Sequence, residues 1–313
     1  MKHIQVCNVL YDVIMTKILI SGGSGLIGSN FTHFLQLEGH EIAWLSRNPK
    51  GMKQQSFYWN PEKGEIDIAC LNGVSTIINL AGAGVADKRW TSAYKSEILN
   101  SRIAATSLLF KTLQNNVHQV GLFIGASAVG IYGNNPPKNC KENSPLGDTF
   151  LAEVCKAWEN ESLRVESLGI QTSIIRIGIV LSEKGGFIKE IAKPAYWGFG
   201  AALGNGKMTT PWIHINDLSK MFAFLIENQK YHGIFNGVAP QPASNQELTT
   251  LICKAIHRPQ WLPPIPGFVL RPMLGEITPM LLANQDISCT KILEAGFQFQ
   301  YPTAEQAIND LLK

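Results

Sequence analysis

The pattern of apolar positions along the first 180 residues predicts strands that alternate with helices. Short, nearly continuous apolar runs are typical of strands buried on both faces, and they occur at 17–21, 41–46, 75–80, 120–126 and 171–179. Helical spacing of apolar positions occurs at 25–38, 93–115 and 149–168. Because right-handed helical crossovers join parallel strands into a sheet covered on both faces, the pattern predicts an α/β fold with a Rossmann-type doubly wound parallel sheet.

The texture of the chain changes after residue 180. Glycine and proline become frequent at 185–211 and 258–279, with short helical segments between them. We therefore predict a small, mostly helical C-terminal lobe, made of about 181–210 and 240–313. The cofactor-binding domain is expected at 15–180, and about 211–239 is expected to return to it. Residues 1–14 are interpreted as an N-terminal extension, either a loose segment or one that precedes a natural start at Met15.

Composition limits the classes of partner. The hydrophobic share of 45% and the charged share of 16% fit a globular protein with a sizeable core. A net charge of +3 gives no reason to expect a nucleic-acid partner. No apolar run reaches the roughly 18 residues that span a membrane. The six cysteines are scattered without metal-ligand spacing, so we expect no metal and a reducing, cytoplasmic location.

A glycine-rich loop joins the first predicted strand to the first predicted helix. Gly22, Gly25 and Gly28 give the spacing G-x-x-G-x-x-G. This spacing allows a tight turn, a close approach of the backbone to a pyrophosphate, and close packing of helix on strand. The free N–H groups of the helix N-terminus favour phosphate. The predicted dinucleotide contacts in this loop are Gly22, Ser24, Gly25, Leu26, Ile27 and Gly28.

The end of the second predicted strand indicates which dinucleotide is bound. A site for NAD places an acidic residue there, where it binds the ribose hydroxyls. This chain has Arg47 instead, and no acidic residue stands beside it. A guanidinium can pair with a 2′-phosphate, so the sequence favours NADP(H) over NAD, although an exposed arginine at this position also has a plain surface role.

Further segments resemble a known family. They are NLAG at 79–82, SAVGIYG at 127–133, FLAEVCKAWE at 150–159, PWIHINDL at 211–218 and LEAGF at 293–297. With the glycine loop, they resemble the YfcH-type epimerase family proteins, an atypical branch of the extended short-chain dehydrogenase/reductases, from about residue 15 to the C-terminus. The resemblance implies NADP(H) contacts at Leu80, Ala81 and Gly82, and by analogy a homodimer through the helices at 93–115 and 149–168. It supplies no reaction.

The catalytic residues depart from the extended family. A Tyr-x-x-x-Lys pair on one helix does the proton chemistry there; Lys156 matches the lysine, but the tyrosine position holds Ala152. Ser127 matches the strand-end serine that polarises the substrate, although the segment from it to Tyr132 is one residue longer than usual. Tyr132 is a candidate replacement for the tyrosine, and packing under its loop is at least as good an interpretation.

Other side chains are weaker candidates. Glu153 lies beside Ala152, and Cys155 precedes Lys156 on the same predicted helix, but a solvated carboxylate and a buried thiol are the better interpretations. Trp212 and His214 lie in a segment that borders the substrate cleft in relatives, yet core packing and a backbone hydrogen bond are common fates for such residues. Arg89 is a candidate for an anionic part of the substrate and equally a surface arginine.

Two functions follow from these residues. The first is an NADP(H)-dependent oxidoreductase or epimerase-like enzyme that acts on a small polar substrate, for which a nucleotide-linked molecule is one option. The second is a non-catalytic NADP(H)-binding sensor or regulatory protein, which the missing tyrosine favours.

Overall fold

The computed structural model describes residues 16–313, so the predicted extension at 1–14 lies outside the described residues. Its central sheet has eight strands in the order β12-β7-β6-β5-β1-β2-β3-β4. The strands are β1 (Lys17–Ser21), β2 (Glu41–Ser46), β3 (Ser56–Asn60), β4 (Glu65–Ile66), β5 (Val74–Asn79), β6 (Leu122–Ala128), β7 (Gln171–Ile177) and β12 (Gly233–Gly237). All neighbouring pairs are parallel except β3 and β4. The predicted doubly wound parallel sheet is confirmed.

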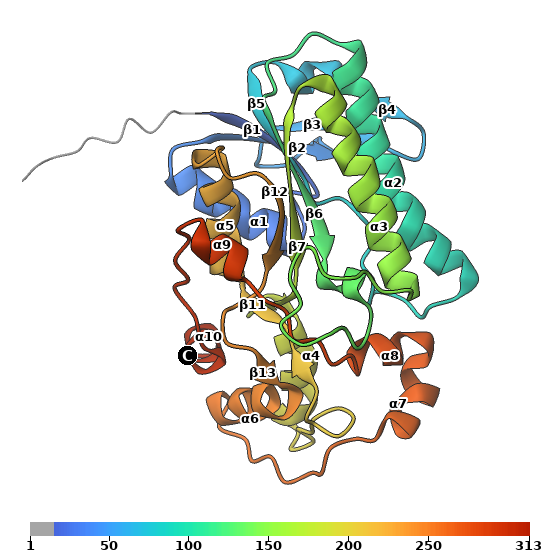
Figure 1. Cartoon of the computed structure of the whole chain (residues 1–313), viewed down its shortest axis with the longest axis vertical. Coiled ribbons are helices and arrows are strands. Elements are labelled where there is room, and N and C mark those ends of the chain that lie inside the picture. The colour runs from blue at the N-terminus through green and yellow to red at the C-terminus, as the bar shows by residue number, and fades with distance from the viewer. Residues whose placement is uncertain (1–15) are drawn as a thin grey trace, which may run out of the picture.

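Helices cover both faces of this sheet (Figure 1). One face carries α1 (Leu26–Leu37) and α5 (Ile215–Glu227), and the other carries α2 (Ser92–Asn115) and α3 (Phe150–Leu163). Side chains of a strand alternate between the two faces. Accordingly, Ile18 and Ile20 share a buried cluster with Phe31 of α1, whereas Leu19 packs with Leu109 of α2.

The connection from β2 to β3 departs from the alternation of strand and helix. These two parallel strands are joined by residues 47–55 without a helix. Neither β3 nor β4 is predicted from the sequence, because β3 is short and carries the exposed Tyr58, and because β4 has only two residues. A 3₁₀ helix, η1 (Ile68–Leu71), leads from β4 toward β5.

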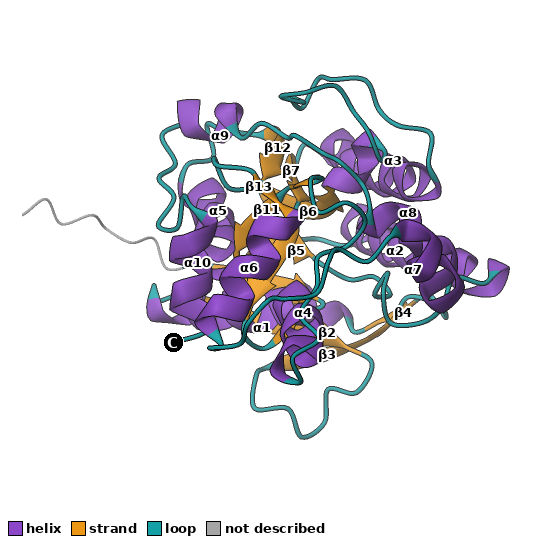
Figure 2. Ribbon diagram, turned by 90° about the horizontal axis from the view of Figure 1, so that it is seen from below, coloured by secondary structure: helices purple, strands orange, loops and turns teal. Residues whose placement is uncertain are grey.

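A second, smaller and mostly helical lobe lies beyond the carboxyl ends of the central strands (Figures 1 and 2), as predicted. Its strands are β8 (Ile179–Ser182), β9 (Gly185–Gly186), β10 (Thr209–Thr210), β11 (Trp212–His214) and β13 (Ala243–Ser244). Its helices are α4 (Phe187–Tyr196), α6 (Asn245–Ala255), α7 (Gly267–Leu274), η4 (Gly275–Ile277), α8 (Thr278–Leu281) and α10 (Ala304–Leu311). Leu248 of α6 and Ile308 of α10 belong to its core.

The two parts of the chain interlock. β12 completes the central sheet beside β7, and α5 packs on α1. The short helix α9 (Thr290–Glu294) packs against β12, and its Ile292 lies in the core of the central sheet. Part of the segment expected in the lobe therefore packs with the cofactor-binding domain.

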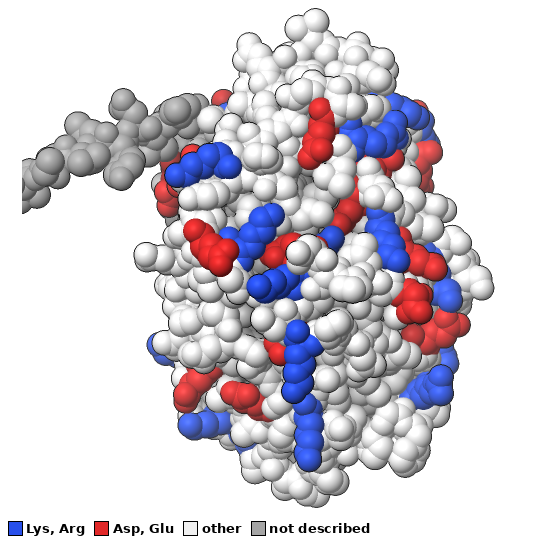
Figure 3. All heavy atoms as spheres, in the orientation of Figure 1, with Lys and Arg blue, Asp and Glu red and all other residues white. Residues whose placement is uncertain are grey.

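The surface carries charges of both signs. On the face drawn in Figure 3, basic and acidic side chains are interspersed among uncharged ones. Within residues 16–313, no helix combines the length and the apolar character needed to cross a bilayer.

Candidate functional site

The glycine loop connects β1 to α1 with the geometry expected of a phosphate cradle. Gly22 has a φ of +74°, which favours glycine, and its carbonyl oxygen accepts a hydrogen bond from the Gly25 N–H at 3.1 Å. Gly25 is the N-cap of α1; no side chain caps the helix there and its first turn contains no acidic residue. The free N–H groups and the positive end of the helix dipole are thus available to an anion.

The close packing of this loop explains its glycines. A Cβ on Gly28 would lie 2.4 Å from the Gly22 oxygen, and a Cβ on Gly22 would lie 3.0 Å from the Leu80 carbonyl carbon. The loop therefore contacts the segment that follows β5, where the other cofactor contacts are predicted. Ser21 and Asn79 join the two strand ends through a side-chain hydrogen bond of 2.6 Å.

The remaining predicted cofactor residues lie around this edge of the sheet. Arg47 directly follows β2 and is exposed, as are Ser24 and Gly82. Leu45 pairs with Ser21 in the register of β2 and β1, so the sheet brings Arg47 to the same edge as the glycine loop. In the part of the chain that the structure describes, Arg47 forms no ion pair.

The helix α3 carries the predicted lysine. Lys156 is partly buried and forms no ion pair within residues 16–313. One turn earlier, Ala152 has an exposed fraction of 0% and lies three residues after the capping Thr149. Ala152 is therefore part of the packed interior, and its side chain has no group that transfers a proton.

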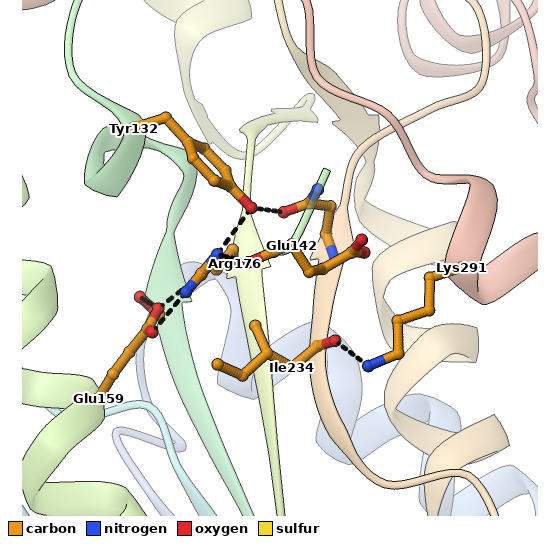
Figure 4. Close-up of polar contacts among 8 residues, drawn as sticks. Tyr132, Glu142, Glu159, Arg176, Ile234 and Lys291 are labelled. Carbon is orange, nitrogen blue, oxygen red and sulfur yellow. Dashed lines mark hydrogen bonds and ion pairs between the residues drawn. The ribbon is translucent and has the colours of Figure 1, made fainter. Parts of the chain in front are cut away.

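Ser127 and Tyr132 belong to a buried polar cluster, of which Figure 4 labels Tyr132, Glu159 and Arg176. The Ser127 hydroxyl donates to Glu159 Oε1 at 2.6 Å, and Arg176 donates to both Glu159 oxygens at 2.9 Å. The Tyr132 hydroxyl accepts from Arg176 Nη1 at 2.8 Å and donates to Asn236 Oδ1 at 2.7 Å. Together these five residues join β6, η2 (Val129–Tyr132), α3, β7 and β12.

This arrangement does not support the catalytic roles predicted for Ser127 and Tyr132. Each side chain is 2% exposed, and their polar atoms already have protein partners. Burial raises the pKa of Tyr132 to about 12. Burial by itself lowers the pKa of Arg176, but the hydrogen bonds and charge of Glu159 outweigh it and raise that pKa. Tyr132 instead packs under its loop, the alternative role that the sequence left open.

Sequence reasoning missed the charged members of this cluster. Arg176 stands among the isoleucines at the end of the buried strand β7, and Glu159 lies on the buried side of α3. Charged residues are rarely buried without a partner, so a charge in each of two buried segments is a signal that the pair meets. No pattern within the sequence identifies Ser127 as the third member.

Trp212 and His214 are turned into the protein interior, with exposed fractions of 1% and 0%. Trp212 Nε1 donates to the Gln241 carbonyl at 3.1 Å. His214 Nδ1 accepts from the Asn216 N–H at the start of α5, and its ring stacks on Tyr301 with 3.8 Å between centroids. The structure does not support their predicted contact with substrate, because neither side chain is accessible.

Arg89 is exposed and packs against the chain at Gly275, where a Cβ would lie 3.0 Å from Arg89 Nε. It therefore lies where the lobe approaches the start of α2. A surface pocket of about 410 Å³ lies elsewhere, between α1 and residues 52–54, and contains none of the predicted site residues. Trp44 borders this pocket and also packs on the glycine loop, because a Cβ on Gly23 would overlap the Trp44 indole at 2.4 Å.

The comparisons with known proteins agree with this geometry. The family model described as the NAD dependent epimerase/dehydratase family matches residues 18–236, and a domain of unknown function, DUF1731, matches 265–311. The epimerase family protein YfhF of Bacillus subtilis is 34% identical over 300 residues, which cover 95% of this chain and 98% of that protein.

Two solved structures are similar to the whole chain. The human epimerase family protein SDR39U1, solved with NADPH, is 28% identical with a TM-score of 0.86 and coverage of 95% of this chain and 99% of that one. A nucleoside-diphosphate sugar epimerase from Corynebacterium glutamicum is 27% identical with a TM-score of 0.78 and coverage of 96% and 59%. On these matches, the chain belongs to the NAD dependent epimerase/dehydratase family, as one of its atypical epimerase family proteins.

Proposed function

We propose that this protein is an NADP(H)-dependent oxidoreductase or epimerase-like enzyme that acts on a small polar substrate. The observation that carries the proposal is the phosphate cradle at the start of α1, with the exposed Arg47 at the same sheet edge. The human relative solved with NADPH supports this choice of cofactor. The glycine loop, Leu80, Ala81 and Gly82 would hold the dinucleotide, and Arg47 would pair with its 2′-phosphate.

Lys156 is proposed to bind the nicotinamide ribose. Its lack of an ion pair within the described residues leaves its ammonium available to ribose hydroxyls. The cofactor would supply the hydride, while the protein supplies orientation and electrostatics. A nucleotide-linked substrate is proposed because one similar solved protein is named as a nucleoside-diphosphate sugar epimerase. The buried free cysteines fit a reducing compartment, and we propose a cytoplasmic location.

A second candidate function is a non-catalytic NADP(H)-binding sensor. Ala152 provides no proton donor, and Ser127 and Tyr132 have buried protein partners. A panel of carbonyl compounds and nucleotide sugars distinguishes the two: turnover of any of them supports the enzyme, and tight NADPH binding without turnover supports the sensor.

The cofactor proposal is tested by titrating NADPH and NADH into the wild type and Arg47→Ala. A charge-assisted contact with the 2′-phosphate predicts that NADPH binds about 10–100-fold more tightly than NADH and that the variant loses this preference. Lys63→Ala is a matched control, because Lys63 is an exposed cation of the β3–β4 turn. Equal affinity of the wild type for the two dinucleotides would exclude the role given to Arg47.

A further inference from the structure

A partly buried arginine with no counter-ion lies beside the predicted cofactor contacts. Arg102 is on α2, and its guanidinium carbon lies 4.9 Å from the centre of the Trp158 ring on α3. Its Nη1 donates to the carbonyl oxygens of Ile98 at 2.9 Å and Ala83 at 3.0 Å. Within the described residues, the Nε and Nη2 groups form no hydrogen bond, so two of its donor groups lack a protein acceptor.

The segment after β5 is built around this side chain. A Cβ on Gly82 would lie 2.9 Å from Arg102 Cγ and 3.0 Å from its guanidinium carbon, so glycine at this position makes room for the arginine. Gly82 itself is exposed and follows Leu80, which contacts the glycine loop. The guanidinium therefore lies directly behind the backbone where a dinucleotide is proposed to bind.

Among the described residues, no negative charge near Arg102 balances its positive charge at neutral pH. No carboxylate of residues 16–313 forms an ion pair with it. The titratable groups that act on it are Cys155 and Tyr94, and burial raises the pKa of each, so both are neutral at pH 7. Burial lowers the pKa of Arg102, which reflects the cost of holding this charge away from water.

The contrast with Arg176 identifies what Arg102 lacks. Arg176 is also an arginine of the interior, but Glu159 neutralises it through two hydrogen bonds of 2.9 Å. A partly buried guanidinium with free N–H groups is suited to bind an oxyanion of a ligand, either a planar carboxylate or a tetrahedral phosphate.

We propose that Arg102 binds an oxyanion of the ligand at the end of β5, either a phosphate of the dinucleotide or a carboxylate or phosphate of the substrate. This inference rests on the site of the proposed function and adds that an anionic group is recognised there by α2. Gly82 and the stacked Trp158 hold the guanidinium in place.

The test compares the wild type, Arg102→Met and Arg102→Lys by calorimetric titration at several NaCl concentrations. The probes are NADPH, inorganic pyrophosphate, and malonate added to the NADPH-saturated protein. We expect Arg102→Met to lower the affinity for at least one probe by about 10–100-fold. The salt dependence of that affinity should also become smaller. Arg102→Lys should restore part of the affinity. Lys111→Met changes an exposed cation of the same helix and should leave all three affinities unchanged.

The outcomes separate the sources of the anion. If Arg102→Met loses affinity for both NADPH and pyrophosphate, Arg102 binds a phosphate of the dinucleotide. If it loses affinity for malonate alone, Arg102 binds an anionic group of the substrate. Because Nη1 also bonds two carbonyl groups, a purely structural role would lower thermal stability without changing the salt dependence, and that result overturns the proposal. If the wild type binds pyrophosphate through Arg102 but does not bind NADPH, the proposed cofactor fails while this inference stands.

Discussion

Among single residues, Glu159 shows how one buried charge determines the roles of its neighbours. Its carboxylate accepts hydrogen bonds from Ser127 and from two nitrogens of Arg176. Ser127 is therefore a donor inside the protein and is not available to a substrate. The sequence identifies Ser127 by its place at a strand end, but its partner lies 32 residues away, and no periodicity encodes such a distant contact.

We expect Glu159→Gln to lower the free energy of unfolding by about 3–5 kcal/mol, because it leaves the buried Arg176 without a balancing charge. Urea denaturation at pH 7 measures this change. Glu161→Gln is the control on the same helix, since its partner Arg164 has a side chain that is 48% exposed, and such pairs contribute less than about 1 kcal/mol. Equal losses in the two variants would contradict a special role for the buried pair.

Among the elements, the β1–loop–α1 unit could be predicted from the sequence almost completely. The glycine spacing predicts the tight turn, and the apolar face of α1 predicts that the helix packs on a sheet. The strands β3 and β4 could not be predicted, because no helix precedes β3 and only Trp59 of its side chains is buried. For the segment that holds Trp212 and His214, the sequence left a cleft border and a core role open, and the structure pairs this segment with β8 in the interior.

The close packing of the glycine loop gives a prediction for Gly28→Ala. The new methyl carbon would lie 2.4 Å from the Gly22 oxygen and 2.7 Å from Gly23 Cα, so the loop must shift. We expect NADPH affinity to fall by at least about tenfold, measured by nicotinamide fluorescence. Gly121→Ala is the control, because a Cβ there has open space around it. Unchanged affinity in Gly28→Ala would show that the loop does not cradle the dinucleotide.

Across the whole molecule, the C-terminal segment is fastened to the cofactor-binding domain through the start of α5. The buried Asp217 accepts hydrogen bonds from the N–H groups of Gln300 and Tyr301 at 2.8 and 2.9 Å. Tyr301 stacks on His214, whose Nε2 lies 3.4 Å from Asp310 Oδ2. The small helical lobe was predictable from composition. The hydrogen bonds from Gln300 and Tyr301 to Asp217 were not, because the residues they join are more than 80 positions apart in the sequence.

His214 makes this junction sensitive to acid. Burial lowers its pKa from 6.5 to about 4, and Asp310 opposes that shift only in part. As the pH falls below 6.5, His214 becomes protonated in the unfolded chain, whereas in the folded chain it stays neutral down to about pH 4. Protons therefore favour the unfolded state, and the free energy of unfolding decreases between these two pH values. We expect the wild type to lose about 2 kcal/mol more than His214→Gln between pH 7 and pH 5, by urea denaturation.

The matched control for this pH effect is His33→Gln, which alters an exposed histidine of α1 and should leave the pH dependence of the wild type intact. A wild type and a His214→Gln variant with parallel stability profiles would rule out His214 as the source of acid sensitivity.

The place of β12 in the sheet has a consequence for the order in which the protein is made. β12 forms an end of the central sheet, yet it is translated after the first third of the small lobe. A nascent chain that ends near residue 180 would present β7 with a free edge and α1 without the apolar cover of α5. The central sheet therefore cannot be completed on the ribosome before the first part of the lobe has been translated, and long-range strand pairing of this kind makes folding slow.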